Sequence, residues 1–322
     1  MSRPYFSCLI VNYNYGRYIR QAIESLLAQD FPAAEREILV VDDGSTDDSV
    51  AVIESFKDKV VLLRQRNLGQ VAGYDAAFQA ARGDVFALGD SDDWWEPQRL
   101  SAFAEALEDP KIGLAQHYLR DVDAQGRPMS NQLPQWPSVY AIDDYVDGRC
   151  EDAATSGLAF RRDVLMKALP VPRTIFSWYD EFLIAHALIH ANMANIPRVL
   201  GYHRVHGANN WAQRLARPDK MVGYVEQGRI FFDHLAKALA ERGKSLTPRF
   251  QQLLDVDFTR SLMMADVARG ERGAALAKWS SLPGGFRKTL LLLGLVHPRL
   301  YMAAYDFYAA SPALRKARRA LS

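Results

Sequence analysis

The sequence predicts an α/β protein with a central, mostly parallel sheet flanked by helices, followed by a helical C-terminal extension. Apolar runs typical of strands alternate with helical patterns at short intervals over residues 6–88, which indicates a doubly wound sheet. Residues 38–41, Ile-Leu-Val-Val, lack polar alternation, as expected of a parallel strand covered on both faces. Strand patterns end after Asn210. We therefore predict one domain over residues 1–210 and a helical extension over residues 211–322.

Each predicted element rests on its own local pattern. Four apolar runs predict strands, at residues 6–11, 38–41, 60–63 and 85–88. Apolar residues at i, i+3, i+4, i+7 and i+8 predict a helix over residues 19–27, and a further helix is predicted over residues 69–81. Between these two helices, we expect Ser45 or Thr46 to cap a helix whose first turn holds two aspartates, because acidic side chains favour a helix N-terminus.

Polar side chains follow three of these strands. They are Asn12-Tyr13-Asn14, Asp42-Asp43 and Asp90-Ser91-Asp92. Because the carboxyl ends of parallel strands meet at one edge of a sheet, we expect these side chains to share that edge. Open α/β sheets bind ligands there, so this edge is the candidate functional site.

The segment Asp90-Ser91-Asp92-Asp93 carries three carboxylates in four residues. Side chains alternate in an extended chain, so Asp90 and Asp92 point one way and Asp93 points the other. Two carboxylates on one face can hold a Mg²⁺ or Mn²⁺ ion that also binds substrate phosphates. The alternative is an Asp-rich turn in which Asp93 caps a helix that begins at Pro97.

Composition limits the class of protein and its compartment. The 322 residues include 39 basic and 38 acidic side chains, and this balance argues against nucleic-acid binding. No Gly-x-Gly-x-x-Gly follows the first strand, which argues against a dinucleotide oxidoreductase. Only two cysteines occur, the N-terminus lacks the apolar core of a signal peptide, and no apolar run approaches the ~20 residues of a membrane span. We therefore expect a cytoplasmic protein.

Several motifs in order along the chain carry a family resemblance. They are residues 7–14 (Ser-Cys-Leu-Ile-Val-Asn-Tyr-Asn), 38–47 (Ile-Leu-Val-Val-Asp-Asp-Gly-Ser-Thr-Asp), 67–70 (Asn-Leu-Gly-Gln), 81–84 (Ala-Arg-Gly-Asp), the acidic segment, 155–162 (Thr-Ser-Gly-Leu-Ala-Phe-Arg-Arg) and 202–206 (Tyr-His-Arg-Val-His). Their order and spacing resemble the family-2, inverting glycosyltransferases of bacterial polysaccharide synthesis, which have the Rossmann-like GT-A fold. The resemblance covers about residues 5–210. It implies a catalytic domain over residues 1–210 that moves one sugar from a nucleotide-sugar, UDP-sugar favoured, to a hydroxyl of a glycan or lipid-linked glycan.

The resemblance also implies a nucleotide-sugar site on the shared edge. Tyr13 is expected against the base, and Asp42 is expected to accept from the uracil N3–H, a charge-assisted bond that selects bases with this donor. A turn-forming Asp is the alternative for Asp42. The full predicted nucleotide-sugar-binding set is Asn12, Tyr13, Asp42, Asp43, Gln70, Asp90 and Ser91.

A divalent cation, Mn²⁺ or Mg²⁺, is the implied cofactor. Its predicted ligands are Asp90, Asp92 and His206, although a hydrogen-bonded loop histidine is the alternative for His206. The ion offsets the charge of the diphosphate, so the nucleoside diphosphate can leave without protonation.

Asp180 matches the family's general base, which takes the proton of the acceptor hydroxyl. The chain departs from the commoner pattern, in which Glu precedes this Asp, because Tyr179 precedes it here and Glu181 follows. The base is therefore Asp180 or Glu181, and we predict Asp180; the alternative is that both acids favour a helix N-terminus. The acidic pair Glu151-Asp152 precedes the acceptor-side strand and is expected to lie away from the base.

A second departure is Gly73-Tyr74-Asp75, where many relatives carry Ala-Arg-Asn. A phosphate-contacting Arg from this helix is therefore missing, and Arg204 or His206 is its candidate replacement.

The predicted acceptor-binding residues are Trp94, Trp95, Ser156 and Trp178. Three of them are tryptophans beside acidic residues, and aromatic faces suit the C–H surfaces of sugars. The alternative is that these tryptophans pack at the sheet edge.

Two other functions stay open at this point. One is a non-catalytic nucleotide-sugar or glycan-binding module on the same scaffold, although the intact acidic segment and Asp180 argue against a decayed enzyme. The other is a sugar nucleotidyltransferase, which usually needs a glycine-rich, basic segment after the first strand. Residues 12–17, Asn-Tyr-Asn-Tyr-Gly-Arg, match that requirement poorly.

The C-terminal third is predicted to be helical. Amphipathic patterns cover residues 224–239 and 249–267, and Pro248 and Gly270 mark the bounds of the second helix. An apolar run over residues 290–296 and a basic end follow. The basic residues are Arg315, Lys316, Arg318 and Arg319. This pattern suits peripheral contact with the inner face of a membrane; the alternative is a helical cap with a solvated basic tail.

Overall fold

The computed structural model describes residues 4–129, 133–206, 218–284 and 292. The chain divides into two compact units, residues 1–204 with 230–245 and residues 205–229 with 246–322. The predicted domain boundary after residue 210, the apolar run over residues 290–296 and the basic C-terminal end lie outside the described residues, apart from residue 292. They remain predictions.

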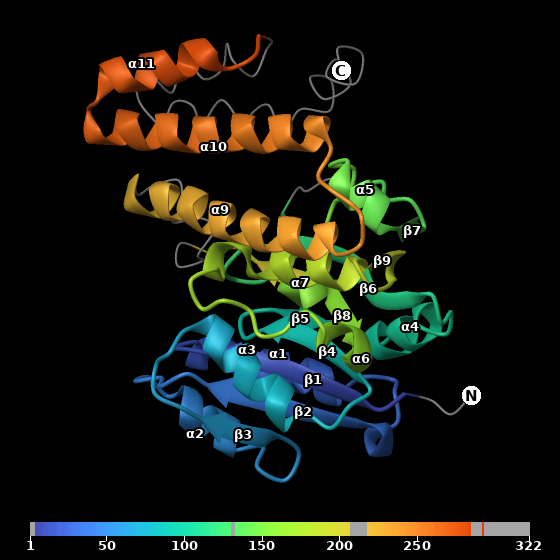
Figure 1. Ribbon diagram of the computed structural model, residues 1–322. Helices are drawn as coiled ribbons and strands as arrows, with labels where there is room; N and C mark the ends of the chain where they lie inside the picture. Colours follow the sequence, from blue (N-terminus) through green and yellow to red (C-terminus); the bar gives the residue numbers. More distant parts are fainter. Residues whose placement is uncertain (1–3, 130–132, 207–217, 285–291, 293–322) are drawn as a thin grey trace. The chain divides into compact units, whose positions relative to one another are not determined.

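A nine-stranded sheet forms the centre of the first unit (Figure 1). The strands are β1 (Phe6–Asn12), β2 (Arg36–Asp42), β3 (Val61–Arg64), β4 (Val85–Asp90), β5 (Trp94–Trp95), β6 (Ile112–Val122), β7 (Val139–Tyr140), β8 (Leu158–Arg161) and β9 (Asn192–Arg204). They lie in the order β3-β2-β1-β4-β8-β6-β9-β5, and β7 pairs with β9. β1 pairs in parallel with β2 and β4, and β2 with β3. The predicted α/β class with helices around a central sheet is confirmed, but the sheet is mixed and not mostly parallel, because four of the eight strand pairings among the described residues are antiparallel.

The pairing of β1 with its two neighbours positions the predicted site. Asn12 lies opposite Asp42 on β2, and Val11 lies opposite Asp90 on β4. The carboxyl ends of the three strands therefore meet at one edge, as the sequence predicts. Because the chain continues to β2 on one side of β1 and returns to β4 on the other, this edge is also a point where strand order reverses, the usual ligand position in such sheets.

The other half of the sheet has mixed strand directions. β8 runs antiparallel to both β4 and β6, whereas β6 and β9 run parallel. The two-residue β5 pairs antiparallel with β9, with Trp94 opposite Tyr202 and Trp95 opposite Gly201. This pairing brings the acidic segment that precedes β5 next to the end of β9.

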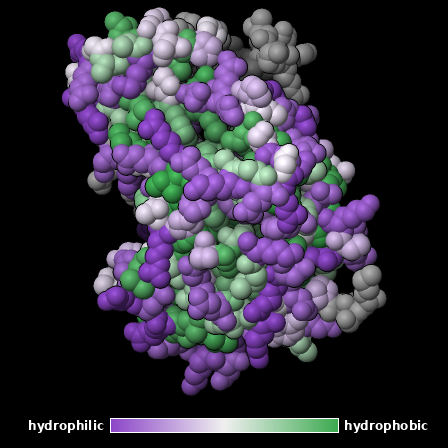
Figure 2. Space-filling model, viewed as in Figure 1, coloured by the Kyte–Doolittle hydropathy of each residue, from purple (hydrophilic) through white to green (hydrophobic). Residues whose placement is uncertain are grey.

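The described residues form helices in both units, and helices of the first unit bury apolar side chains against the sheet. The helices are α1 (Gly16–Leu27), α2 (Ser49–Glu54), α3 (Gln70–Ala80), α4 (Arg99–Ala106), α5 (Ile142–Val146), α6 (Arg162–Leu165), α7 (Tyr179–Leu188), α9 (Pro218–Ala240), α10 (Pro248–Arg269) and α11 (Arg272–Ser281). The predicted apolar stripe of α1, including Ile19 and Ile23, is buried in one cluster with Ile10 and Val40 of the sheet. On the face seen in Figure 2, hydrophilic residues are spread widely, with hydrophobic residues between them.

The second unit has its own small core, which includes Met221, Met263, Met264 and Ala275. The predicted bounds of α10 are confirmed, because Thr247 caps its start by accepting from the N–H of a residue in the first turn, and Gly270 ends it with a φ of +80°. Among the described residues, no helix is both long and apolar enough to cross a membrane.

Arg99, at the start of α4, is fully buried. Its Nη2 donates to Leu88 O at 2.5 Å and to Ser156 O at 3.1 Å, and its Nε donates to His117 Nε2 at 3.1 Å. Burial lowers the pKa of Arg99 to about 10, so the side chain stays charged at neutral pH. The guanidinium thus joins the end of β4 to the segment before β8 and supports the strand that carries the acidic residues.

Replacing Arg99 with Met should lower the free energy of unfolding by about 3 kcal/mol, because two buried carbonyls lose their donor. Urea unfolding of the variant and the wild type measures the difference. Arg20→Met is the matched control, since Arg20 is half-exposed and its ion pair with Glu24 is 3.9 Å long; that change should stay within about 0.5 kcal/mol. Equal effects of the two substitutions would show that the buried bonds of Arg99 contribute little.

Candidate active site

Hydrogen bonds join the loops that follow β1 and β2. Asn12 Nδ2 donates to Asp42 Oδ1 at 3.0 Å and to Ser45 Oγ at 3.1 Å. Asn14 N also donates to Ser45 Oγ, and Thr46 N donates to Asn14 Oδ1 at 2.8 Å. The two loops therefore form one ordered edge at the carboxyl ends of their strands.

The cap predicted for the next helix is wrong. α2 begins only at Ser49, and Asp48 at its N-cap position makes no side-chain capping bond. Ser45 and Thr46 are bonded to the first loop instead. Gly44 makes this turn with a φ of +78°, and the N–H of Ser45 then donates to Asp42 Oδ2 at 3.0 Å.

Asp43 is buried and organises the loop before α3. Its carboxylate accepts from the backbone N–H groups of Leu68 and Gly69, both at 2.8 Å. These bonds fix the first residue of α3, Gln70, whose Nε2 donates to Asp90 Oδ1 at 3.3 Å. Asp43 thus acts on the shared edge through the position of Gln70.

The side chains of the acidic segment are turned toward different elements. Asp93 Oδ1 accepts from the backbone N–H of Arg204 on β9 at 2.8 Å, whereas Asp90 Oδ1 meets Gln70 of α3. Asp92 is buried, and its carbonyl accepts from Arg204 Nε at 2.9 Å. Asp93 therefore does not cap a helix: it ties the segment to β9.

Arg204 is a structural residue, so the suggestion that it replaces the missing phosphate-binding Arg is not supported. The side chain is buried, and its two terminal nitrogens donate to Gln21 Oε1 at 2.7 Å and Ala124 O at 3.1 Å. Its Cζ lies 4.5 Å from the ring centre of Tyr18 and 4.6 Å from that of Trp94. These contacts direct the guanidinium into the protein.

The acidic segment concentrates negative charge. Burial raises the pKa of Asp90 well above its usual range, and the charges of Asp93, Asp92 and Asp180 raise it further. Burial, followed by the charge of Asp92, raises the pKa of Asp93 to about 7. These shifts indicate carboxylates held close together against their mutual repulsion.

A divalent cation would relieve this repulsion, and carboxylate oxygens are suitable ligands for Mg²⁺ and Mn²⁺. Within the described residues, however, no group of three or more His, Cys, Asp or Glu side chains is arranged to hold a metal. An ion held by Asp90 and Asp92 would therefore take its further oxygens from a substrate or from water.

His203 is a charged residue that sequence reasoning missed. Its Nδ1 lies 3.0 Å from Asp121 Oδ1. Burial lowers the pKa of His203, but the bond to Asp121 and the charges of Asp93, Asp121 and Asp90 outweigh burial and raise the pKa to about 9. An imidazolium therefore faces the acidic segment. The sequence signal for His203 is its place in the Tyr-His-Arg-Val-His motif, in which His206 and not His203 is the predicted metal ligand.

The two candidate bases lie at the start of α7 with different partners. Asp180 Oδ1 accepts from Thr155 Oγ1 at 2.6 Å, and Glu181 Oε1 accepts from Tyr145 OH at 2.7 Å. Burial raises the pKa of both carboxyls. Asp180 also lies close enough to the acidic segment to raise the pKa of Asp90.

Asp152 lies closer to these acids than the sequence suggested. Burial and then the charges of Glu181 and Asp180 raise the pKa of Asp152 well above its usual range. The expectation that Glu151-Asp152 lies away from the base is therefore wrong for Asp152. The segment before β8 folds back toward the start of α7, as the bond between Thr155 and Asp180 also shows.

The two departures from the family pattern meet in space. Tyr74 and Tyr179 stack with ring centres 5.3 Å apart and an angle of 18° between their planes. Tyr74 OH donates to Gly89 O at 2.9 Å, and both rings are buried. An aromatic stack thus stands where the commoner pattern has Arg and Glu, and it packs the start of α7 against α3.

Three of the four predicted acceptor-binding residues are buried. Trp95 Nε1 donates to Ser156 O at 2.8 Å, and Ser156 Oγ accepts from Asp90 N at 2.9 Å. Trp178 packs against Phe231 and Phe232. These three side chains have structural contacts, which favours the packing alternative.

The remaining predicted residues differ in exposure. Trp94 is half-buried and stacks on Tyr202 with ring centres 4.9 Å apart. Tyr13 is 43% exposed, as a residue that receives a base must be, whereas Ser91 is buried. His206 is buried two residues beyond β9, and it is in no group of three metal-binding side chains among the described residues.

The sequence profile named "Glycosyl transferase family 2" matches residues 7–169, which is half of the chain and includes the shared edge of β1, β2 and β4. The chain belongs to glycosyl transferase family 2. An uncharacterized glycosyltransferase of Nostoc sp. is 36% identical over 213 residues, which cover 63% of this chain and 66% of the relative. Membership of this family supports a glycosyltransferase that acts on nucleotide-sugars.

The fold is of the GT-A type, because it is similar to two solved glycosyltransferase structures. Staphylococcus aureus TarS in complex with UDP-GlcNAc is 16% identical, with a TM-score of 0.57 over 85% of this chain and 88% of that one. The mannosyltransferase PcManGT from Pyrobaculum calidifontis, in complex with GDP-Man and Mn²⁺, is 18% identical, with a TM-score of 0.59 over 98% of this chain and 83% of that one. At these identities the likeness establishes the fold alone.

Proposed function

We propose that this enzyme transfers a single sugar, with inversion, from a metal-bound UDP-sugar to a hydroxyl of a glycan or lipid-linked glycan during cell-surface polysaccharide synthesis. The observation that carries the proposal is the pairing of Asn12 with Asp42 and of Val11 with Asp90, with Asp180 close by. The predicted donor-binding residues Asn12, Asp42 and Asp90 would then lie at the shared edge, with the candidate base Asp180 near them. The similarity of the chain to TarS, a poly(ribitol-phosphate) β-N-acetylglucosaminyltransferase, supports the polysaccharide setting.

The nucleotide would lie along the edge formed by the first two loops. Tyr13 is exposed to receive the base. Asp42 is buried and accepts from Asn12 Nδ2 and Ser45 N, and its bond to the imide N–H would add to these two bonds. Gln70 and Asp90 are joined to each other and follow on the same edge toward the sugar. Asp43 would contribute to nucleotide binding indirectly, because its bonds to the loop before α3 position Gln70.

Asp90 and Asp92 would hold Mn²⁺ or Mg²⁺ together with the diphosphate, with His206 as the further predicted ligand. The bound ion would neutralise the charge that develops on the leaving nucleoside diphosphate. Asp93 and Arg204 keep the acidic segment in place from the opposite side.

Asp180 would remove the proton of the acceptor hydroxyl as the hydroxyl oxygen attacks the anomeric carbon from the face opposite the diphosphate. Its bond from Thr155 orients the carboxylate, and burial raises its pKa, which makes it a stronger base when ionised. The enzyme would work in the cytoplasm or at the inner face of the membrane, where nucleotide-sugars and lipid-linked acceptors meet.

Calorimetric titration of UDP, GDP, ADP and dTDP, with and without Mn²⁺, tests the donor half of this proposal. Manganese-dependent binding of UDP or dTDP alone is the expected result, because Asp42 selects the imide N–H. Tight binding of GDP or ADP would overturn the assignment of the base-recognition residues. Absence of binding by folded protein would instead favour a non-catalytic module, and release of pyrophosphate from a nucleoside triphosphate would identify a nucleotidyltransferase.

A further inference from the structure

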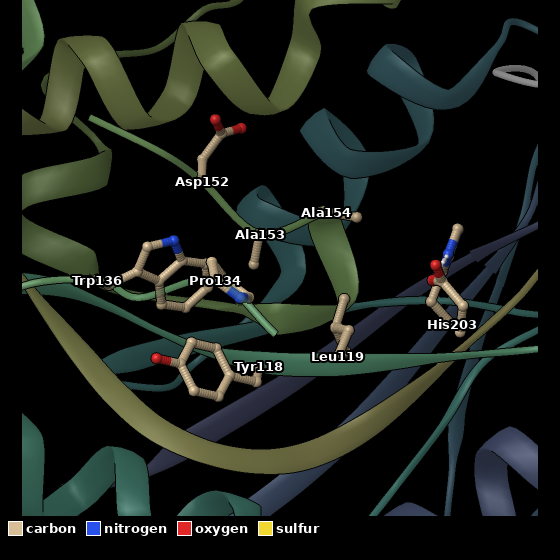
Figure 3. A pocket seen from close by; sticks show the side chains of 9 residues that line it. Tyr118, Leu119, Pro134, Trp136, Asp152, Ala153, Ala154 and His203 are labelled. Carbon is tan, nitrogen blue, oxygen red and sulfur yellow. Dashed lines mark hydrogen bonds and ion pairs between the residues drawn. The ribbon is translucent and has the colours of Figure 1, made fainter. Parts of the chain in front are cut away.

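A pocket of about 170 Å³ lies beside the candidate active site, and none of its lining residues belongs to the predicted site (Figure 3). We call it the Trp136 pocket. Tyr118 and Trp136 stand at one side of it and His203 at the other, with Leu119 between them and Asp152 along one wall. Its volume is several times the ~30 Å³ that one water occupies in the liquid, so it can admit a larger group.

The aromatic side of the pocket offers both an apolar face and an unused donor. The rings of Tyr118 and Trp136 lie 4.7 Å apart at 52°. Trp136 is half-buried, and its Nε1 is shielded from solvent with no acceptor among the residues that the structure describes. A ligand that carries both C–H faces and oxygen atoms, as a sugar ring does, would satisfy the indole in both respects.

The polar side of the pocket connects it to the reacting groups. His203 is bonded to Asp121, and its positive charge acts on Asp90 and Asp93 of the acidic segment and on Asp180. Asp152, which solvent reaches, is in turn affected by the charges of Asp180 and Glu181. A ring in the pocket would therefore present hydroxyls between the acidic segment and the candidate base.

We propose that the Trp136 pocket binds the acceptor sugar, that Trp136 and Asp152 are its contacts, and that the ring it selects carries no negative charge. The proposal rests on the proposed function and deepens it by naming the acceptor class. Trp136 lies against the ring face, and Asp152 hydrogen-bonds the hydroxyls.

The charges around the pocket account for the selection. Two carboxylates, those of Asp121 and Asp152, line the pocket, and Glu181 and Asp180 add their negative charges near Asp152. A uronate or a phosphate placed beside it would meet the same repulsion. The one cation that lines the pocket among the described residues, His203, is paired with Asp121 and is outnumbered by the two carboxylates.

Saturation-transfer NMR tests the proposal with the full-length protein, UDP and Mn²⁺. The probes are the methyl glycosides of glucose, galactose and mannose, each compared with its own uronic acid. At least one neutral glycoside should bind, and its uronic acid should bind at least about tenfold more weakly. Equal or tighter binding of the uronic acid would overturn the charge selection.

Matched variants locate the binding. Trp136→Ala should weaken binding of the neutral glycoside about tenfold, whereas Trp136→Phe, which keeps an aromatic face, should restore most of it. Asp152→Ala should weaken binding as well, and the neighbouring Glu151→Ala, outside the pocket, should not.

UDP titration separates the two proposals: wild-type protein that binds no UDP refutes the proposed function. Protein that binds UDP but no glycoside, or binds a glycoside independently of Trp136 and Asp152, refutes the pocket assignment alone.

Discussion

Replacing Asp180 with Asn should lower the rate of sugar transfer by about 10²–10⁴-fold, the usual contribution of a general base. The amide keeps the shape of the carboxylate, and its oxygen can still accept from Thr155 Oγ1, so the start of α7 should be unchanged. Affinity for UDP in the presence of Mn²⁺ should stay at the wild-type value, because Asp180 removes a proton and does not hold the donor. Transfer rates and calorimetric titration on the same preparation provide the two measurements.

The pH dependence offers an independent check on Asp180. Burial raises the pKa of its carboxyl, and a base must be ionised to act, so the transfer rate should rise with pH over a range above the ~3.9 of a free Asp. Glu181→Gln is the matched control, since Glu181 is adjacent on α7 and bonded to Tyr145. Transfer that survives in Asp180→Asn and is lost in Glu181→Gln would move the role of base to Glu181.

The part of the site that the sequence could predict is the part that local patterns determine. Uninterrupted apolar runs identify β1, β2 and β4, and the rule that parallel strands end at one edge then brings Asn12, Asp42 and Asp90 together. No long-range information is needed for this step. The same reasoning identified α1 and α10, because their apolar periods and end residues are also local.

The residues that sequence reasoning missed depend on contacts between distant segments. His203 faces the acidic segment only because β5 pairs with β9, and these two strands are far apart in the chain. Asp152 approaches Asp180 only because the segment before β8 folds back on α7. A buried Arg99 likewise cannot be distinguished in sequence from a solvated arginine at a helix start.

Carboxylates present a further ambiguity, because the same residue type serves ligands and the protein itself. Asp90 ends β4 and Asp43 directly follows β2, so the sequence makes each an equally good candidate to bind a ligand. In the structure, Asp43 accepts from two backbone N–H groups and is buried, whereas Asp90 stays at the edge with one weak bond from Gln70. Burial and the number of internal donors thus distinguish Asp43 from Asp90, and neither can be read from the sequence.

Replacing Asp92 with Asn should abolish the manganese dependence of UDP binding and weaken that binding by at least about tenfold, while the melting temperature stays near the wild-type value. The substitution removes one of the two negative charges that attract the ion and leaves the shape of the side chain, and hard divalent cations bind carboxylates far better than amides. Titration of UDP with and without Mn²⁺ measures the first effect, and thermal unfolding measures the second.

Asp93→Asn is the control that makes the Asp92 result specific, because it makes the same Asp-to-Asn change at the next residue. Asp93 accepts from Arg204 N and is turned toward β9, so its loss should lower stability and leave the manganese dependence of UDP binding in place. If the ion instead responded only to the total charge of the segment, the two variants would weaken UDP binding equally. A difference between them therefore distinguishes a directed metal ligand from a general acidic patch, and wild-type manganese dependence in Asp92→Asn would exclude Asp92 as the ligand.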